Sequence, residues 1–221
     1  MPGPLSSALR NDLAKTVTAA RRSAETGARA ALTTLAVDAA SPHPGMSEAD
    51  KSLRRWLRAR GRQLGDRRDP GSETQAIDRL VHEIAYEHWH RLLFARFLAE
   101  NDLLIHPDLG EAITLDEVED LAREQGVDRH ALAASYAQRS LPQIFRTDDP
   151  VLDVELAVEY RNAIQKLLAD LPDTVFTADD SLGWTYQYWQ ADQKDAVNAA
   201  GDKIGADEIS AVTQLFTEHY M

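Results

Sequence analysis

The segment from Ile77 to Ala95 carries the pattern that most constrains the fold. Its apolar side chains, together with one histidine, recur at spacings of three and four residues and so share one face of an α-helix: Ile77, Leu80, Val81, Ile84, His88, Leu92 and Ala95. Such a face must be buried against other elements. No stretch of the chain shows the sustained apolar and polar alternation of a half-buried strand. The sequence therefore predicts an all-α fold.

Helices are also expected before this segment. A long N-terminal helix is predicted from about residue 5 to residue 37, and the proline- and glycine-containing stretch 41–45 ends it. A second, strongly basic helix opens at Ser47 and ends near residues 61–65. Together these predict a long basic N-terminal helical arm.

Capping signals place the helices of the C-terminal part. Thr114 and Glu117 form a capping box, and Gly126 ends the short helix that follows. Further helices are expected over the ranges 128–139, 152–171, 181–201 and from 206 to the chain end. The expected architecture is a multi-helix array of helical hairpins.

Charge divides the chain near residue 70. Residues 1–70 hold 13 Lys and Arg against 7 Asp and Glu, a net charge of +6, whereas residues 71–221 hold 11 against 29, a net charge of −18, which together give −12. The polar stretch 66–73 contains Pro70 and Gly71 and coincides with this change of sign. We therefore predict a basic helical arm over 1–70 and an acidic helical domain over 71–221.

Arginines are dense in the second helix and just after it. Such a density makes phosphate neutralisation, and hence contact with DNA, physically possible. The alternatives are a solvated surface or a face that docks on the acidic body, and they are as well supported as DNA contact. The candidate DNA-binding residues are Arg54, Arg55, Arg58, Arg62, Arg67 and Arg68.

Other residue types offer no catalytic or metal centre. His82, His88 and His90 are separated by six and two residues, which does not place them on one helix face, and His88 is interpreted as a hydrogen-bonded core or rim histidine. Paired acidic residues mostly precede predicted helices, where they favour capping over acid–base catalysis. The chain has no cysteine and no Gly-x-Gly. No apolar run is long enough for a membrane span, so a cytoplasmic protein without a membrane partner is expected.

Three segments carry a resemblance to a known family. They are AYEHWHRLLFARFLAENDLLIHPD (residues 85–108), LPQIFRTDDPVLD (141–153) and the stretch from VFTADDSLGWTYQYWQ to the chain end (175–221). In this order they resemble the N-terminal helical region of adenine-specific DNA methyltransferases of the PglX kind and of their relatives in BREX- and DISARM-type phage defence. The basic N-terminal segment is similar to theirs as well, though more loosely.

The resemblance implies a cofactor contact near the C-terminus. Gln214, Phe216 and Thr217 match a short stretch that lines the S-adenosylmethionine pocket in the family, while Glu218 stands in place of its proline. The family's glycine-rich cofactor turn and its Asn-Pro-Pro-Tyr-like motif have no counterpart here. S-adenosylmethionine is therefore expected in the parent enzyme, and no cofactor and no catalytic residue are assigned to this chain alone.

Two functions follow from the sequence. The first is the N-terminal helical fragment of an S-adenosylmethionine-dependent DNA adenine methyltransferase of a phage-defence system. It would brace the catalytic domain, contact DNA and meet other defence-system proteins, with the chain ending at Met221 before a complete methyltransferase domain. The alternative is a stand-alone helical adaptor module for protein partners, without enzymatic activity.

Overall fold

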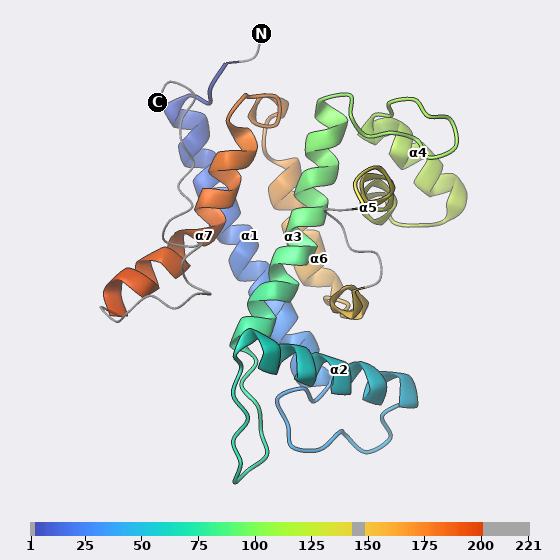
Figure 1. The fold of residues 1–221 in the computed structure, drawn as a ribbon. Helices are drawn as coiled ribbons and strands as arrows, with labels where there is room; N and C mark the ends of the chain where they lie inside the picture. Colours follow the sequence, from blue (N-terminus) through green and yellow to red (C-terminus); the bar gives the residue numbers. More distant parts are fainter. Residues whose placement is uncertain (1–2, 143–148, 201–221) are drawn as a thin grey trace. The chain divides into compact units, whose positions relative to one another are not determined.

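The computed structural model describes residues 3–142 and 149–200, with the side chains of 192–200 left out. Within these residues it is all-α, with two isolated β-bridges and no strand, as the sequence predicts. The helices, shown in Figure 1, are α1 (Ser7–Thr34), α2 (Glu48–Leu64), α3 (Asp78–Glu100), α4 (Leu115–Gln125), α5 (Arg129–Ser140), α6 (Val158–Ala169) and α7 (Ser181–Ala200), with short 3-10 turns at Pro150–Asp153 and Asp173–Val175.

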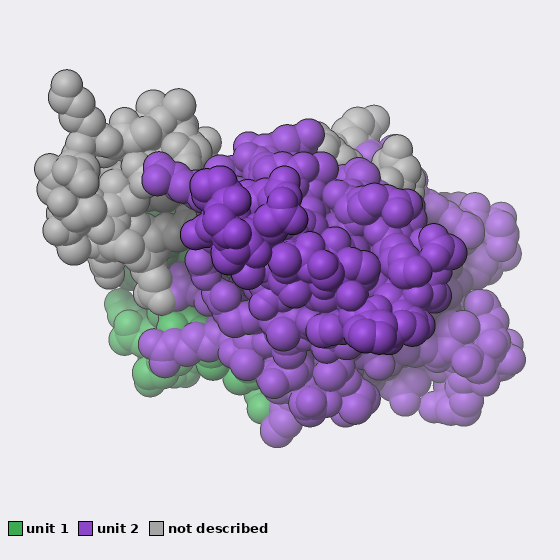
Figure 2. Space-filling view, turned by 90° about the horizontal axis from the view of Figure 1, so that it is seen from below, with its two compact units in different colours: residues 1–19, 167–221 green, residues 20–166 purple. Residues whose placement is uncertain are grey.

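The chain forms two compact units, which Figure 2 colours separately. One contains residues 1–19 and 167–221, and the other contains residues 20–166, so the divisions fall inside α1 and α6. These units differ in extent from the predicted arm (1–70) and domain (71–221), whose boundary stays a prediction.

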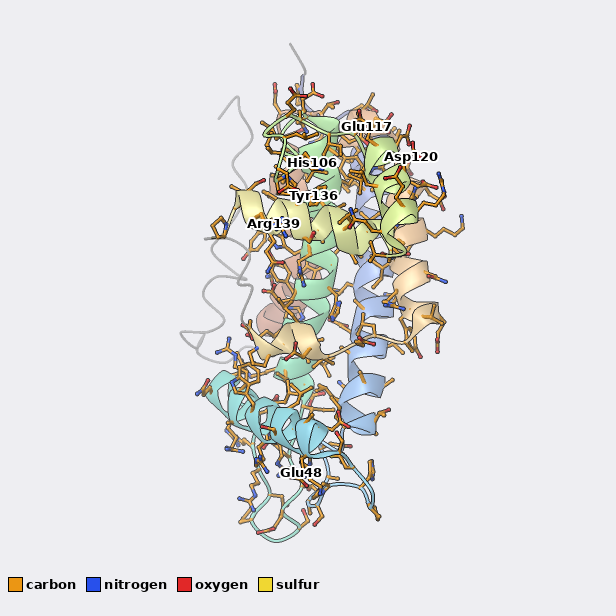
Figure 3. The ribbon with its side chains drawn as sticks, turned by 90° about the vertical axis from the view of Figure 1, so that its right-hand side faces the viewer. Glu48, His106, Glu117, Asp120, Tyr136 and Arg139 are labelled. Atoms are coloured by element: carbon orange, nitrogen blue, oxygen red, sulfur yellow. The ribbon has the colours of Figure 1, made fainter. Side chains whose placement is uncertain are left out.

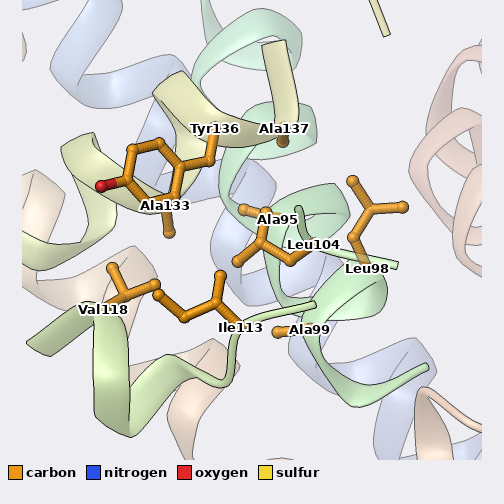
Figure 4. Close-up of a cluster of buried hydrophobic side chains, with 9 residues drawn as sticks. All are labelled: Ala95, Leu98, Ala99, Leu104, Ile113, Val118, Ala133, Tyr136 and Ala137. Carbon is orange, nitrogen blue, oxygen red and sulfur yellow. The ribbon is translucent and has the colours of Figure 1, made fainter. Parts of the chain in front are cut away.

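In the larger unit, residues 20–166, α3 packs on α5 and α2. Its predicted apolar face is largely buried, since Leu80, Val81, Ile84 and Ala95 are each at most 3% exposed. One core cluster joins α3, α4 and α5 (Figure 4), and alanines on α3 and α5 allow their backbones to approach closely. Its members are Ala95, Leu98, Ala99, Leu104, Ile113, Val118, Ala133, Tyr136 and Ala137.

The predicted caps of this unit are confirmed. Ser47 caps α2 by accepting the backbone N–H of Asp50, and Gly65 ends the helix in the left-handed conformation. Thr114 and Glu117 form the reciprocal capping box of α4, and Figure 3 labels Glu117 on this helix. The His106 and Tyr136 rings meet edge to face at 5.4 Å.

The helix predicted over 152–171 is wrong at its N-terminal end. Asp149 caps a 3-10 turn by accepting the N–H of Val151 at 3.0 Å, and the chain is then extended until α6 begins at Val158. The extended backbone places the carbonyl of Val154 2.8 Å from His88 Nε2. Packing against α3 thus overrides the local helical preference, and it confirms that His88 is a hydrogen-bonded histidine at the core.

In the smaller unit, Asp180 ties the chain's N-terminal segment to α7. Its carboxylate is 5% exposed and accepts the N–H of Leu5 at 2.8 Å and the Trp184 indole N–H at 2.7 Å. Trp184 stacks on Tyr188, four residues later in α7, at 5.5 Å, and Arg10 lies over the Trp184 ring. The helix predicted from residue 206 lies outside the described residues.

The buried ring of His90 on α3 is expected to make the fold less stable in acid. His90 stacks on Tyr86 at 5.2 Å and touches Phe94 at 5.5 Å, and burial lowers the pKa of His90 to about 4. Below about pH 6.5 His90 binds a proton in the unfolded chain but stays neutral in the folded one. The contribution of His90 to stability is therefore full above about pH 6.5 and is lost as the pH falls towards 4. We expect up to about 3 kcal/mol of lost unfolding free energy from this residue.

Urea unfolding at about pH 7 and about pH 4.5 measures this loss, and His90→Phe keeps the stacked ring while removing the titration. The variant should retain part of the pH dependence, because burial also lowers the pKa of His88 and of His130. An equal pH dependence in the variant and the unaltered protein would contradict the assignment.

Candidate nucleic-acid interface

Helix α2 divides its arginines between two faces. Arg54, Leu57, Arg58 and Gly61 follow one another at spacings of three and four residues, and all are buried. Arg55 and Arg62 are seven residues apart, so they share an outward face, and both are exposed. A single basic helix therefore presents two chemically distinct surfaces.

The inward arginines bind the chain that leaves α1. Arg54 donates from Nε to the carbonyl of Ala36 at 2.8 Å and from Nη2 to the carbonyl of Ala39 at 2.6 Å. Arg58 donates from Nη1 to the carbonyls of Val37 at 2.7 Å and Ala39 at 2.5 Å, and from Nη2 to that of Glu73 at 2.9 Å. Both side chains act as staples between α2 and its neighbouring loops.

Burial accounts for the electrostatics of this pair. Arg54 and Arg58 are 7% and 8% exposed, and desolvation lowers the pKa of each guanidinium from its ordinary value. A guanidinium stays charged in proteins, so the carbonyl dipoles must take the place of water around it. These two guanidinium groups hold the fold together and are not available to DNA.

The other four candidates lie exposed on α2 and on the loop that follows it. Arg62 donates to Gln75 Oε1 at 3.1 Å, and Arg68 pairs with Glu73 at 2.8 Å. Arg55 and Arg67 make no ion pair or side-chain hydrogen bond with the residues that the structure describes. Two of the four charges thus have no partner in the described part of the chain, and two more are held by exposed or neutral partners.

Residues 67–76 form a hydrogen-bonded hairpin loop between α2 and α3, seen as two close arms in Figure 1. Arg68 and Gln75 form an antiparallel bridge, and Asp69 Oδ1 accepts the N–H groups of Gly71 at 2.7 Å and Ser72 at 2.8 Å. The N–H groups of Ser72 and Gly71 lower the pKa of Asp69. The loop therefore holds Arg67 and Arg68 in a defined place beside α2.

Part of the positive charge of α2 is used for docking within the larger unit. Arg60 forms an ion pair with Glu83 of α3, and this bond raises the pKa of Arg60. The alternative drawn from the sequence was that basic residues dock on acidic ones. It holds for Arg60 but not for Arg55, Arg62 and Arg67, which pair with no described acidic residue.

The remaining predictions concern a cofactor contact, metal ligands and a membrane span. Gln214, Phe216 and Thr217 lie outside the described residues, so the cofactor contact stays a prediction. Within residues 3–142 and 149–200, no three His, Asp or Glu side chains gather as metal ligands would. Across the same part of the chain, no helix combines the length and apolarity that crossing a membrane requires.

These observations define a class, an all-α module with an exposed basic surface on one helix and its adjoining loop. Two curated proteins are similar to it. The adenine-specific methyltransferase PglX of Lacticaseibacillus casei (strain Zhang) is 26% identical over 191 residues, covering 67% of this chain and 16% of that protein. The adenine-specific methyltransferase BrxX of Escherichia coli O9:H4 (strain HS) is 24% identical over 182 residues, covering 68% of this chain and 15% of that protein.

The resemblance predicted from the sequence is confirmed as weak homology to PglX- and BrxX-type methyltransferases. The chain spans about a sixth of the length of these curated relatives. No family model and no solved structure matches it.

Proposed function

We propose that this chain is the helical region of an S-adenosylmethionine-dependent DNA adenine methyltransferase of a phage-defence system. In that setting it braces the catalytic domain, contacts the DNA backbone and meets other defence proteins. The homology to two adenine-specific methyltransferases supports the enzyme class. S-adenosylmethionine belongs to the catalytic domain of such an enzyme, and we assign no cofactor to this chain alone.

The observation that carries DNA contact is the basic surface formed by Arg55, Arg62, Arg67 and Arg68. These side chains are exposed, they come from one helix and its adjoining hairpin loop, and three of them have no acidic partner among the described residues. Guanidinium groups bind phosphate oxygens without reading sequence. The surface would position DNA and leave recognition of the adenine to the catalytic domain.

DNA binding should therefore depend steeply on salt. Each neutralised phosphate contributes about −0.9 to the slope of log affinity against log salt, so four contacts predict a loss of roughly a hundredfold between about 50 and 200 mM salt. Replacing Arg55, Arg62, Arg67 and Arg68 together by glutamine should abolish measurable binding to a fluorescent duplex. Any binding that remains should depend less steeply on salt.

A matched control removes four cations elsewhere. Lys15, Arg22, Arg123 and Arg139 are exposed, and glutamine at all four gives the same change of net charge. This variant should bind DNA nearly as well as the unaltered chain. Equal binding by both quadruple variants, or binding that ignores salt, would remove the basic surface from the proposal.

The adaptor alternative would use exposed apolar side chains. Leu103 and Leu109, on the segment between α3 and α4, are 52% and 69% exposed. An adaptor would bind its protein partner with no dependence on Arg55 or Arg67. The two quadruple variants therefore separate the two candidate functions. A loss of binding in one variant and not in the other is expected for DNA contact and not for the adaptor.

A further inference from the structure

A cavity within the larger unit belongs to neither proposed function. Side chains of α3, α5, α6 and the extended segment before α6 line it, and its volume is about 210 Å³. A dry cavity of about 150 Å³ is large enough for benzene. This space therefore suits a small organic molecule.

Two arginines face this cavity, Arg91 from α3 and Arg161 from α6. Arg91 donates from Nη2 to the buried Gln138 at 2.8 Å, while its Nε is buried and has no hydrogen-bond partner among the described residues. Arg161 is exposed at the rim, and its guanidinium binds no described residue. Two arginine side chains, each positively charged, thus border the cavity from two helices.

The two histidines of the lining are uncharged, so its positive charge comes from the two arginines. Burial lowers the pKa of His88, and the charges of Arg91 and Arg161 lower it further. Burial also lowers the pKa of His130, whose Nε2 accepts from Arg129 Nε at 3.2 Å, so a neutral His130 carries its proton on Nδ1. Both rings are therefore neutral at about pH 7.

One oxygen of the acidic side chain in the lining, Asp128, is already engaged. Asp128 caps α5 and accepts the N–H groups of His130 at 3.0 Å and Ala131 at 2.9 Å with Oδ1. Glu87, whose charge raises the pKa of Arg91 against the lowering by burial, is outside the lining.

Apolar side chains complete the walls. Leu92, Leu156 and Ile164 come from α3, the extended segment and α6, and Ala131 and Ala134 come from α5. Ligand sites commonly combine such apolar walls with a few convergent polar groups. A matching ligand has an apolar body and one charged end.

We propose that this cavity binds a small organic anion, with its oxyanion held by the guanidinium groups of Arg91 and Arg161 and its apolar body packed between α3, α5 and α6. A carboxylate and a phosphate monoester share this chemistry, because both accept two hydrogen bonds from the planar guanidinium fork. The site is independent of the basic surface on α2.

Calorimetric titration of the full chain with benzoate, phenyl phosphate and neutral benzyl alcohol tests the proposal. We expect one of the two anions to bind with a Kd of about 1 mM or tighter, and the stronger of the two identifies the oxyanion. Benzyl alcohol should bind at least about tenfold more weakly, since it lacks the charge that the arginines recognise.

The variant Arg161→Gln removes one guanidinium at the exposed rim and should weaken the anion at least about tenfold. Arg55→Gln removes an exposed arginine from α2 and should leave the affinity unchanged; circular dichroism checks that both variants are folded. Binding of neither anion, equal binding of benzyl alcohol, or an unchanged affinity in a folded Arg161→Gln protein would overturn the proposal.

Discussion

Replacing Arg58 by methionine is expected to lower the free energy of unfolding by about 3 kcal/mol. Methionine keeps most of the side-chain volume and removes all three hydrogen bonds that Arg58 donates. The carbonyls of Val37 and Glu73 then lose the hydrogen bonds that Arg58 gives them, while that of Ala39 keeps Arg54. Val37 is fully buried, so water does not readily replace the lost donor.

Urea unfolding followed by far-UV circular dichroism measures this effect, and Arg55→Met is the matched control. Arg55 is exposed and binds no described residue, so its replacement should change the unfolding free energy by less than about 0.5 kcal/mol. Arg58→Lys keeps the charge without the planar fork and should fall between the two. Equal stability of the Arg58→Met and Arg55→Met variants would show that the stapling bonds contribute nothing.

Local signals predicted the helices of this chain well because each is complete within a few residues. Ser47 caps its own helix, and the capping box of Thr114 and Glu117 closes within one turn. The start of α6 was missed for the opposite reason. The bond from His88 to the carbonyl of Val154 joins residues 66 apart, and no short-range pattern contains it.

The candidate interface could be predicted only as a set of charges. The density of arginines gave the right segment, but it treated Arg54 and Arg58 like Arg55 and Arg62. A signal that separates them is present in the sequence, because Arg54, Leu57, Arg58 and Gly61 form a stripe at helical spacing. A glycine and a leucine on one face with two arginines indicate that this face is turned inward.

The cavity offered no comparable signal. Its cationic residues, Arg91 and Arg161, stand 70 positions apart in the sequence, and each alone has the pattern of an ordinary surface arginine. Their meeting depends on how α6 packs near α3 and α5, and α6 itself begins later than its sequence predicts. The tertiary contact that shifted α6 is thus part of the same arrangement that forms the cavity.

Replacing Asp66 by alanine should cost about 2–3 kcal/mol of unfolding free energy. Asp66 is 6% exposed and lies 13 residues before Arg79 in the first turn of α3, where Ile77 makes no side-chain cap. Its Oδ1 accepts the N–H of Arg79 at 3.0 Å and its Oδ2 accepts the N–H of Leu80 at 3.1 Å. Alanine leaves both donors unpaired at the positive end of the helix dipole.

Asp66→Asn tests whether charge matters, because its amide oxygen can accept one N–H while its NH₂ group repels the other; about half of the loss is expected. Asp69→Ala is the matched control. Asp69 also accepts two backbone N–H groups, but it is exposed, so water can take its place and the loss should be much smaller. If Asp66→Ala and Asp69→Ala unfold at the same urea concentration, burial does not strengthen the cap. The N-terminus of α3 is then stabilised by packing and not by the hydrogen bonds to Asp66.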